Sequence, residues 1–239
     1  MIARLKPFIF LLCLVPFGQL AYSAYSGDLG VNPIDFITHF TGSWALIFLI
    51  GTLAVTPVRR LTGWNDLIKL RRMLGLFAFS YASAHFATYL VLDHFFDWQA
   101  IGKDIIKRPY VTAGFTAFVI MLPLALTSTA GMIRRLGKRW QKLHRLIYVA
   151  ALAGVIHFYW LVKADIRRPA QYGLILAVLL FYRILVNWRS GITKSLPGRP
   201  VRPPKRIIPK NAPNLFPGTR PDEDLLFVSL RLTLAQRLS

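Results

Sequence analysis

The sequence predicts an all-α polytopic membrane protein: a six-helix transmembrane bundle with a disordered C-terminal tail. Two observations support this fold class. Hydrophobic residues fill 54% of the 239 positions and charged residues only 17%, a balance outside that of ordinary soluble domains. The apolar residues also gather into runs of about 20, the length that an α-helix needs to cross a bilayer. We therefore expect lipid to surround most of the chain.

Six segments qualify or nearly qualify as spans, at residues 8–25, 36–57, 73–92, 111–130, 143–163 and 170–188. The first is the weakest, because a basic start, a short apolar core and small residues after it are also typical of a cleaved signal peptide. We expect three parts: a first transmembrane helix in residues 1–26, with a signal anchor or signal peptide as the alternative, a transmembrane core in residues 27–188, and a basic, Pro-rich cytoplasmic tail in residues 189–239.

Lys and Arg predict the orientation, because short loops rich in these residues stay in the cytoplasm. Basic residues precede the first span and crowd the loops between spans two and three and between spans four and five, whereas residues 27–35 hold neither Lys nor Arg. Both termini are therefore expected in the cytoplasm. The net charge of +20 is spread between apolar runs, which argues against nucleic-acid binding. We detect no internal repeat.

One cysteine, Cys13, excludes an intrachain disulfide, a Cys-type zinc site and an iron–sulfur cluster. Histidines at membrane depth are the remaining candidates for chemistry, since burying an ionisable side chain in a bilayer is costly. Each of them alone could simply bond a neighbouring backbone carbonyl or hydroxyl.

Depth distinguishes one pair. His85 follows Arg72 by 13 residues and His157 follows Arg145 by 12, so both lie about 18 to 20 Å into the membrane on parallel helices. Two imidazoles at one height can bind the iron of a haem from both faces. No Cys-x-x-Cys-His motif occurs, so the haem would be of the non-covalent b type.

His144 lies about 20 Å below His157 along the same helix, so the two cannot hold one iron. Thirteen residues before His85 stands Arg72 and not a histidine, and His144 lies some 140° around a regular helix from His157, so we do not expect a complete second haem site. We expect the basic cluster near His144 to bind an anionic group, a haem propionate or a flavin phosphate, with Trp140 available for stacking. The alternative is that these residues only satisfy the positive-inside rule. His39 lies close to the proposed haem in depth, as a propionate partner, an axial ligand or an interfacial polar residue. His94 is expected to be solvent-exposed. The basic cluster named above, around His144, comprises Arg71, Arg72, Lys138, Arg139, Lys142, His144 and Arg145.

With these residues in view, the chain resembles the MsrQ (YedZ) family of haem-binding membrane subunits, which are ferric-reductase-like transmembrane proteins. The likeness covers roughly residues 27–188. It is carried by motifs in matching order: residues 27–33 leading to 39–42, Thr56-Pro57, residues 71–76, His85, residues 108–110, 127–129 and 136–144, and Ile156-His157. The resemblance implies a six-helix inner-membrane bundle, with His85, His144 and His157 as haem-ligating histidines and FMN as a further cofactor.

The resemblance also implies electron transfer from the quinone pool or a cytosolic flavin reductase to a partner, MsrP, a periplasmic molybdopterin enzyme that reduces methionine sulfoxide in oxidised proteins. The chain itself would then be an electron-transfer subunit and not the enzyme that reduces the sulfoxide. Two alternatives remain open: a reductase that passes electrons directly to ferric or other metal ions or to oxygen, and a non-redox transporter whose histidines relay protons.

Overall fold

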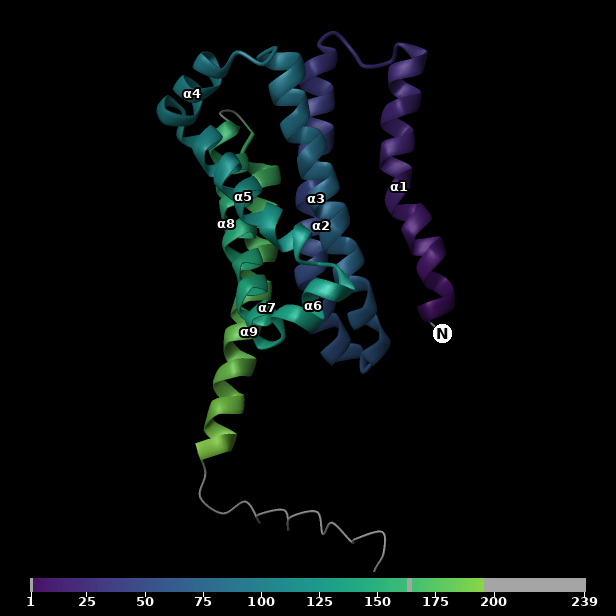
Figure 1. Cartoon of the computed structure of the whole chain (residues 1–239), viewed down its shortest axis with the longest axis vertical. Helices are drawn as coiled ribbons and strands as arrows, with labels where there is room; N and C mark the ends of the chain where they lie inside the picture. The colour runs from purple at the N-terminus through teal and green to yellow at the C-terminus, as the bar shows by residue number, and fades with distance from the viewer. Residues whose placement is uncertain (1, 163–164, 196–239) are drawn as a thin grey trace, which may run out of the picture. The chain divides into compact units, whose positions relative to one another are not determined.

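The computed structural model describes residues 2–162 and 165–195; most of the tail expected in residues 189–239 lies outside them. No strand occurs in the described part of the chain, and six of its helical segments are long and apolar enough to span a membrane. The expected all-α, six-span fold is therefore confirmed (Figure 1). The helices are α1 (Ile2–Ser26), α2 (Pro33–Thr62), α3 (Ile68–Thr88), α4 (Trp98–Lys107), α5 (Pro109–Leu126), α6 (Ala130–Leu136), α7 (Lys138–Leu143), α8 (Ile147–Leu161) and α9 (Arg167–Ser195).

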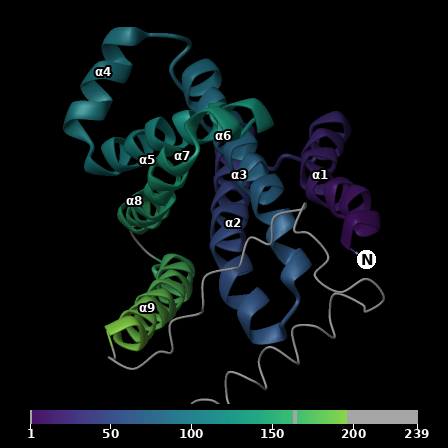
Figure 2. The same cartoon turned by 60° about the horizontal axis from the view of Figure 1, so that its bottom comes forward.

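Two helical hairpins form the centre of the bundle. Helix α2 packs along α3, and α5 packs along α8, with a smaller contact between α3 and α5 that joins the two pairs (Figures 1 and 2). Asn32 caps α2 by accepting a hydrogen bond from the backbone of Asp35, and Pro33 follows at the first helical position, where its missing N–H costs nothing. The loop after α2 begins at Gly63, whose positive φ of 73° ends the helix in the left-handed conformation.

Helix α1 is held against α3 by one buried tyrosine. The hydroxyl of Tyr81 accepts a hydrogen bond from Phe17 N at 3.1 Å and donates one to Cys13 O at 3.0 Å. These two backbone groups are four residues apart, so the hydroxyl stands between the two partners of a normal helical hydrogen bond. The Tyr81 ring also stacks on Phe17, with ring centroids 3.9 Å apart. The first helix is thus a packed part of the bundle.

Helix α4 lies in a stretch that the apolar pattern left as a loop. Asp97 begins it by accepting hydrogen bonds from the backbone N–H groups of Gln99 and Ala100. Only Ile101 of this helix is buried. Ten residues with one buried side chain carry too weak an apolar signal to be recognised as a span, which is why sequence reasoning missed the helix.

The expected span at residues 143–163 is less regular than predicted. A 3₁₀ turn, His144–Leu146, separates α7 from α8. Because a 3₁₀ turn has about 3.0 residues per turn and not 3.6, the 140° angle calculated between His144 and His157 is wrong. An angle of 140° holds only for one continuous α-helix.

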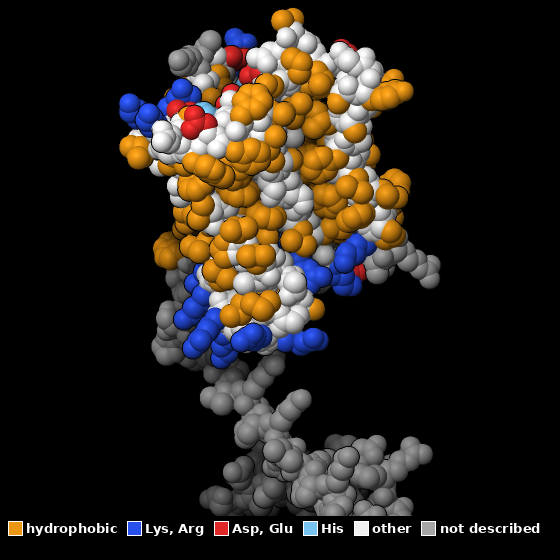
Figure 3. Space-filling view, turned by 45° about the horizontal axis from the view of Figure 1, so that its top comes forward, with side chains coloured by type: hydrophobic (Ala, Val, Ile, Leu, Met, Phe, Trp, Pro, Cys, Tyr) orange, Lys and Arg blue, Asp and Glu red, His pale blue; other side chains and the backbone are white. Residues whose placement is uncertain are grey.

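Basic side chains gather around one end of the helices, below a broad band of apolar side chains (Figure 3). We call this the basic end. It carries the basic residues at the end of α2, at the start of α3 and in the segment from α6 to α8, namely Arg59, Arg60, Lys69, Arg71, Arg72, Arg134, Arg135, Lys138, Arg139, Lys142 and Arg145. The opposite end, near α4, carries acidic as well as basic side chains.

Candidate haem site

A cavity of about 290 Å³ opens between α2, α3, α5 and α8. Its wall is mostly apolar, from Leu46, Phe86, Phe118 and their neighbours, and both His85 and His157 line it. The two imidazole rings have centroids 6.0 Å apart and planes inclined at 75°. The predicted juxtaposition of these histidines from the third and fifth spans is therefore confirmed.

Each of the two histidines is fixed by a backbone carbonyl of the neighbouring helix. Nδ1 of His85 lies 2.9 Å from Thr38 O, and Nδ1 of His157 lies 2.7 Å from Tyr110 O. A carbonyl only accepts, so Nδ1 must carry the proton and donate in both cases. Nε2 of each neutral ring is then left with its lone pair, which is the form in which histidine binds a metal.

A glycine lies against each imidazole ring. A Cβ at Gly42 would come within 3.0 Å of His85 Nδ1, and a Cβ at Gly114 would come within 2.7 Å of His157 Nδ1. The contact at Gly114 would force the ring or the helix to shift, and the contact at Gly42 would require the His85 ring to move by a few tenths of an ångström. These positions therefore need glycine so that α2 and α5 can approach the histidines closely.

The two hairpins repeat this construction. In each, the histidine follows its carbonyl partner by 47 residues, and the glycine follows the carbonyl residue by four. The second set, Tyr110, Gly114 and His157, lies 72 residues after the first, Thr38, Gly42 and His85. The sequence showed no internal repeat because only the glycine and the histidine are identical in the two sets.

Polar residues line the cavity toward the end opposite the basic end. His39 is half exposed and lies 3.4 Å from Asp35 in the preceding turn of α2. Arg108 also lines the cavity, and its guanidinium lies 3.1 Å from Asp104 and 3.4 Å from the Tyr110 hydroxyl. The hydrogen bond to Tyr110, together with Asp104, raises the pKa of Arg108 above its ordinary value. Arg108 is therefore a fixed positive charge beside the cavity, a role the sequence did not indicate.

His144 lies elsewhere and is not among the residues that line the cavity. Its Nδ1 lies 3.1 Å from Trp140 O, its Nε2 lies 3.4 Å from Ser128 Oγ, and its ring stacks on Trp140 at 3.9 Å. It also stands 72 residues after Arg72, so the position equivalent to it in the first hairpin holds an arginine. Within the described chain, no second histidine faces His144 as His157 faces His85.

The remaining predicted residues of the basic cluster lie at the basic end. Arg72 and Arg145 are exposed and Arg71 is half-buried. Trp140 donates its indole N–H to Thr127 O at 3.0 Å, and one face of its ring is covered by His144. Stacking on Trp140 is therefore open on one face of the indole at most.

The expectation that His94 is solvent-exposed is wrong. Its side chain is only 15% exposed, and its Nε2 lies 3.3 Å from Asp104 and 3.7 Å from Asp93. Its ring packs edge-on against Tyr89. Helix α4 folds back and brings Asp104 over His94, a contact between residues ten apart that no local pattern could predict.

The donor set and the cavity fit one haem. With metal–nitrogen bonds of about 2 Å, two imidazoles on opposite sides of one iron have ring centres about 6 Å apart, which agrees with the 6.0 Å observed. The apolar wall suits a porphyrin, and Arg108 and His39 are suitable partners for its propionates.

Comparisons with known proteins identify the family of the chain. Residues 41–155 match the family model described as "Ferric reductase like transmembrane component". A protein of Herminiimonas arsenicoxydans is 54% identical over 189 residues, covering 78% of this chain and 87% of its own length; its name is "Protein-methionine-sulfoxide reductase heme-binding subunit MsrQ". The chain belongs to the MsrQ family.

MsrQ proteins of Azospira oryzae and Rhodospirillum rubrum carry the same name. They are 50% and 49% identical, covering 79% and 74% of this chain and 82% and 86% of their own lengths. No solved structure matches the chain. Membership of the MsrQ family, together with the six apolar helices, makes this a multi-pass membrane protein.

Proposed function

We propose that this MsrQ-family chain is an electron-transfer subunit that binds a b-type haem between His85 and His157. The observation that carries the proposal is the pair of imidazoles 6.0 Å apart, each with Nδ1 bonded to a carbonyl, beside an apolar cavity. The curated relatives are named as heme-binding subunits, which supports the same cofactor.

The chain's own residues would prepare the site before any cofactor enters. The carbonyls of Thr38 and Tyr110 fix both rings in the tautomer that leaves Nε2 free, and Gly42 and Gly114 let the helices close on them. The apolar wall excludes water and lowers the local dielectric, which tunes the potential of a bound iron. A haem held there supplies one-electron transfer.

The proposed route runs across the bacterial inner membrane, with both termini and the basic end in the cytoplasm. The donor would be the quinone pool or a cytosolic flavin reductase. The acceptor would be MsrP, the periplasmic molybdopterin methionine-sulfoxide reductase, docking on the loops at residues 27–35 and 93–110, which include α4. FMN belongs to the same proposal, because sulfoxide reduction takes two electrons and a flavin converts between two-electron and one-electron delivery.

A visible spectrum of the purified protein, before and after dithionite, tests the haem directly. We expect a sharp b-type band in the wild type and loss of most bound haem in His85→Ala and in His157→Ala. His94→Ala is the control, since it removes an imidazole that does not line the cavity. Equal haem content in all three variants would refute the axial assignment. A wild type without any haem band would favour the proton-relay transporter.

Electron delivery needs a separate assay. Reduced holoprotein should be reoxidised by MsrP with methionine sulfoxide, and ferric ions or oxygen without MsrP should reoxidise it far more slowly. Equally fast reoxidation by ferric ions alone would place the chain with direct metal reductases.

A variant at His144 tests the haem assignment and the flavin assignment separately. Because it lies apart from the cavity and bonds Trp140 and Ser128, we expect His144→Ala to keep the b-type spectrum while lowering FMN retention or the rate of reduction by the donor. Complete haem loss in this variant would show that His144 is an iron ligand.

A further inference from the structure

A second, smaller cavity of about 40 Å³ lies at the basic end, between α2, α8 and α9, away from the haem site. Its lining is divided by chemistry. Leucines and a proline form one part, and two arginines, a threonine and two tyrosines form the other. The lining residues are Leu53, Thr56, Pro57, Arg60, Tyr148, Leu179, Leu180, Tyr182 and Arg183.

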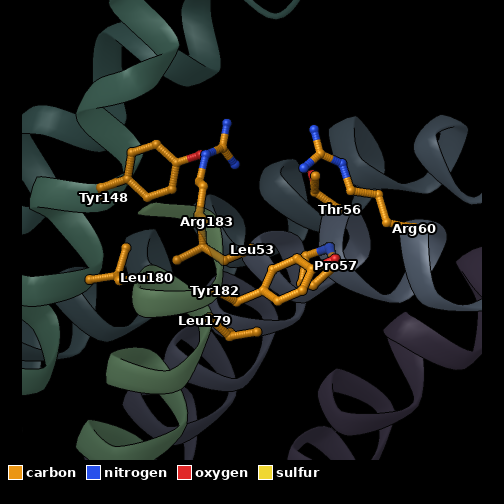
Figure 4. A pocket seen from close by; sticks show the side chains of 9 residues that line it. All are labelled: Leu53, Thr56, Pro57, Arg60, Tyr148, Leu179, Leu180, Tyr182 and Arg183. Carbon is orange, nitrogen blue, oxygen red and sulfur yellow. The ribbon is translucent and has the colours of Figure 1, made fainter. Parts of the chain in front are cut away.

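The polar groups of this cavity converge. Arg60 and Arg183 project their guanidinium groups to the same side, with Thr56 beside Arg60 and Tyr148 beside Arg183 (Figure 4). The guanidinium carbon of Arg183 stands 4.6 Å from the centre of the Tyr148 ring, a cation–π contact that holds Arg183 in place.

Two hydroxyls here are buried and make no hydrogen bond to any other described group: Thr56 Oγ1 and Tyr148 Oη. A buried polar atom without a partner costs free energy, so a native structure normally supplies one. The tendency of basic residues to lie at one end of a membrane protein accounts for the arginines. It does not account for two unpaired hydroxyls beside them.

Positive charge accumulates around this cavity. The charges of Arg60, Arg71 and Arg145 all act on Arg183. Within the described part of the chain, no carboxylate forms an ion pair with any of these four arginines. An anion among the guanidinium groups would relieve the repulsion between these charges.

We propose that this cavity binds the phosphodiester headgroup of an anionic membrane phospholipid. The two guanidinium groups would bind the anionic phosphate oxygens, and the hydroxyls of Thr56 and Tyr148 would donate to the remaining acceptors. The glycerol and acyl chains would leave the cavity past the half-buried Leu179 and Leu180.

Size and position select this occupant. A volume of about 40 Å³ is a few times the space that one water needs, enough for a phosphate group and too little for the fused rings of a flavin or the ring of a quinone. Arg60 stands three residues before Gly63, where α2 ends, which is the depth of lipid headgroups. A free phosphate would leave the apolar part of the lining without a partner.

Native mass spectrometry of the delipidated holoprotein in detergent tests the site. Both lipids carry a phosphodiester, but the quaternary ammonium of phosphatidylcholine adds a positive charge that the arginines would repel. We therefore expect phosphatidylglycerol to bind at least about tenfold more tightly than phosphatidylcholine, and Arg60→Gln/Arg183→Gln to abolish this preference. Arg134→Gln/Arg135→Gln is the matched control, because it removes the same charge from two exposed residues of α6 and should retain the preference. The haem spectrum reports folding in every variant, so failure of this proposal is distinguishable from failure of the haem assignment.

Smaller changes test the hydroxyls. Tyr148→Phe and Thr56→Val keep the shape of the cavity, and each should weaken phosphatidylglycerol binding about three- to tenfold. Equal binding of both lipids, or undiminished preference in the double arginine variant, would overturn the proposal. Displacement of phosphatidylglycerol by inorganic phosphate or by FMN at matched concentration would also overturn it, assigning the site to a free phosphate or to a flavin.

Discussion

At the scale of single residues, the site depends on which nitrogen of each imidazole is free. The carbonyls of Thr38 and Tyr110 decide this by occupying Nδ1 of His85 and His157. These carbonyls are main-chain atoms, so no substitution at either position removes them directly. Gly42 and Gly114, one helical turn after these carbonyls, set how closely α2 approaches the His85 ring and α5 approaches the His157 ring.

Replacing these glycines should give a graded loss of haem. Gly114→Ala places a methyl group 2.7 Å from His157 Nδ1, whereas Gly42→Ala places one 3.0 Å from His85 Nδ1. We expect haem content per chain, measured by the pyridine haemochrome assay, to fall several-fold in Gly114→Ala and less in Gly42→Ala.

Gly51→Ala is the control for this pair, because a Cβ at Gly51 meets no atom within 4 Å and alanine is a better helix former than glycine by about 1 kcal/mol. It should keep full haem content. If Gly114→Ala also binds haem at the wild-type level, the close approach of α5 to His157 is not required for the site.

At the scale of helices, the hydroxyl of Tyr81 on α3 bonds two backbone groups of α1. Tyr81→Phe keeps the stacking on Phe17 but leaves Cys13 O and Phe17 N without their shared partner. We expect the free energy of local opening of α1 around residues 13–17 to fall by about 1–3 kcal/mol.

Hydrogen exchange followed by mass spectrometry measures this effect. Exchange should rise in the α1 peptides around residues 13–17 and stay unchanged in α5 and α8. Tyr159→Phe is the control, since Tyr159 is exposed on α8. Uniformly faster exchange along the whole chain would mean that Tyr81 stabilises the bundle in general and not the attachment of α1.

The apolar pattern predicts the long helices because each one must hide its backbone polar groups from lipid, a requirement that leaves a continuous signal in the sequence. Depth along two such helices was enough to pair His85 with His157. The pattern fails where structure depends on contacts across the fold. The packing of His94 against Asp104 is of this kind. The pattern also misses α4, which buries only one side chain, and the 3₁₀ turn at His144, which interrupts a span without changing its apolar character.

At the scale of the whole molecule, the basic end predicts the orientation in the membrane. A cysteine at exposed Gln141, at the basic end, should be protected from a membrane-impermeant maleimide in intact spheroplasts, whereas one at exposed Gln99 in α4 should react. Both substitutions belong in a Cys13→Ala background, which removes the chain's one native thiol. The reverse labelling pattern would invert the proposed direction of electron flow.

The two hairpins repeat the same construction around His85 and His157, but the position in the first hairpin that is equivalent to His144 holds Arg72. The described residues therefore offer one site with two facing histidines. We predict one tightly bound haem per chain, measured as the ratio of haem to protein in the purified monomer. Two haems per chain, both retained in His85→Ala, would require ligands other than this pair.

The most direct test of the central claim is electron paramagnetic resonance of the oxidised, purified protein. Two imidazoles on one iron give a low-spin ferric signal, and ring planes inclined at 75° give the highly anisotropic form with one dominant low-field feature. We predict that signal in the wild type and its disappearance in His85→Ala and in His157→Ala. A high-spin, five-coordinate signal in the wild type, or a low-spin signal that survives in either variant, would contradict haem ligation by this histidine pair.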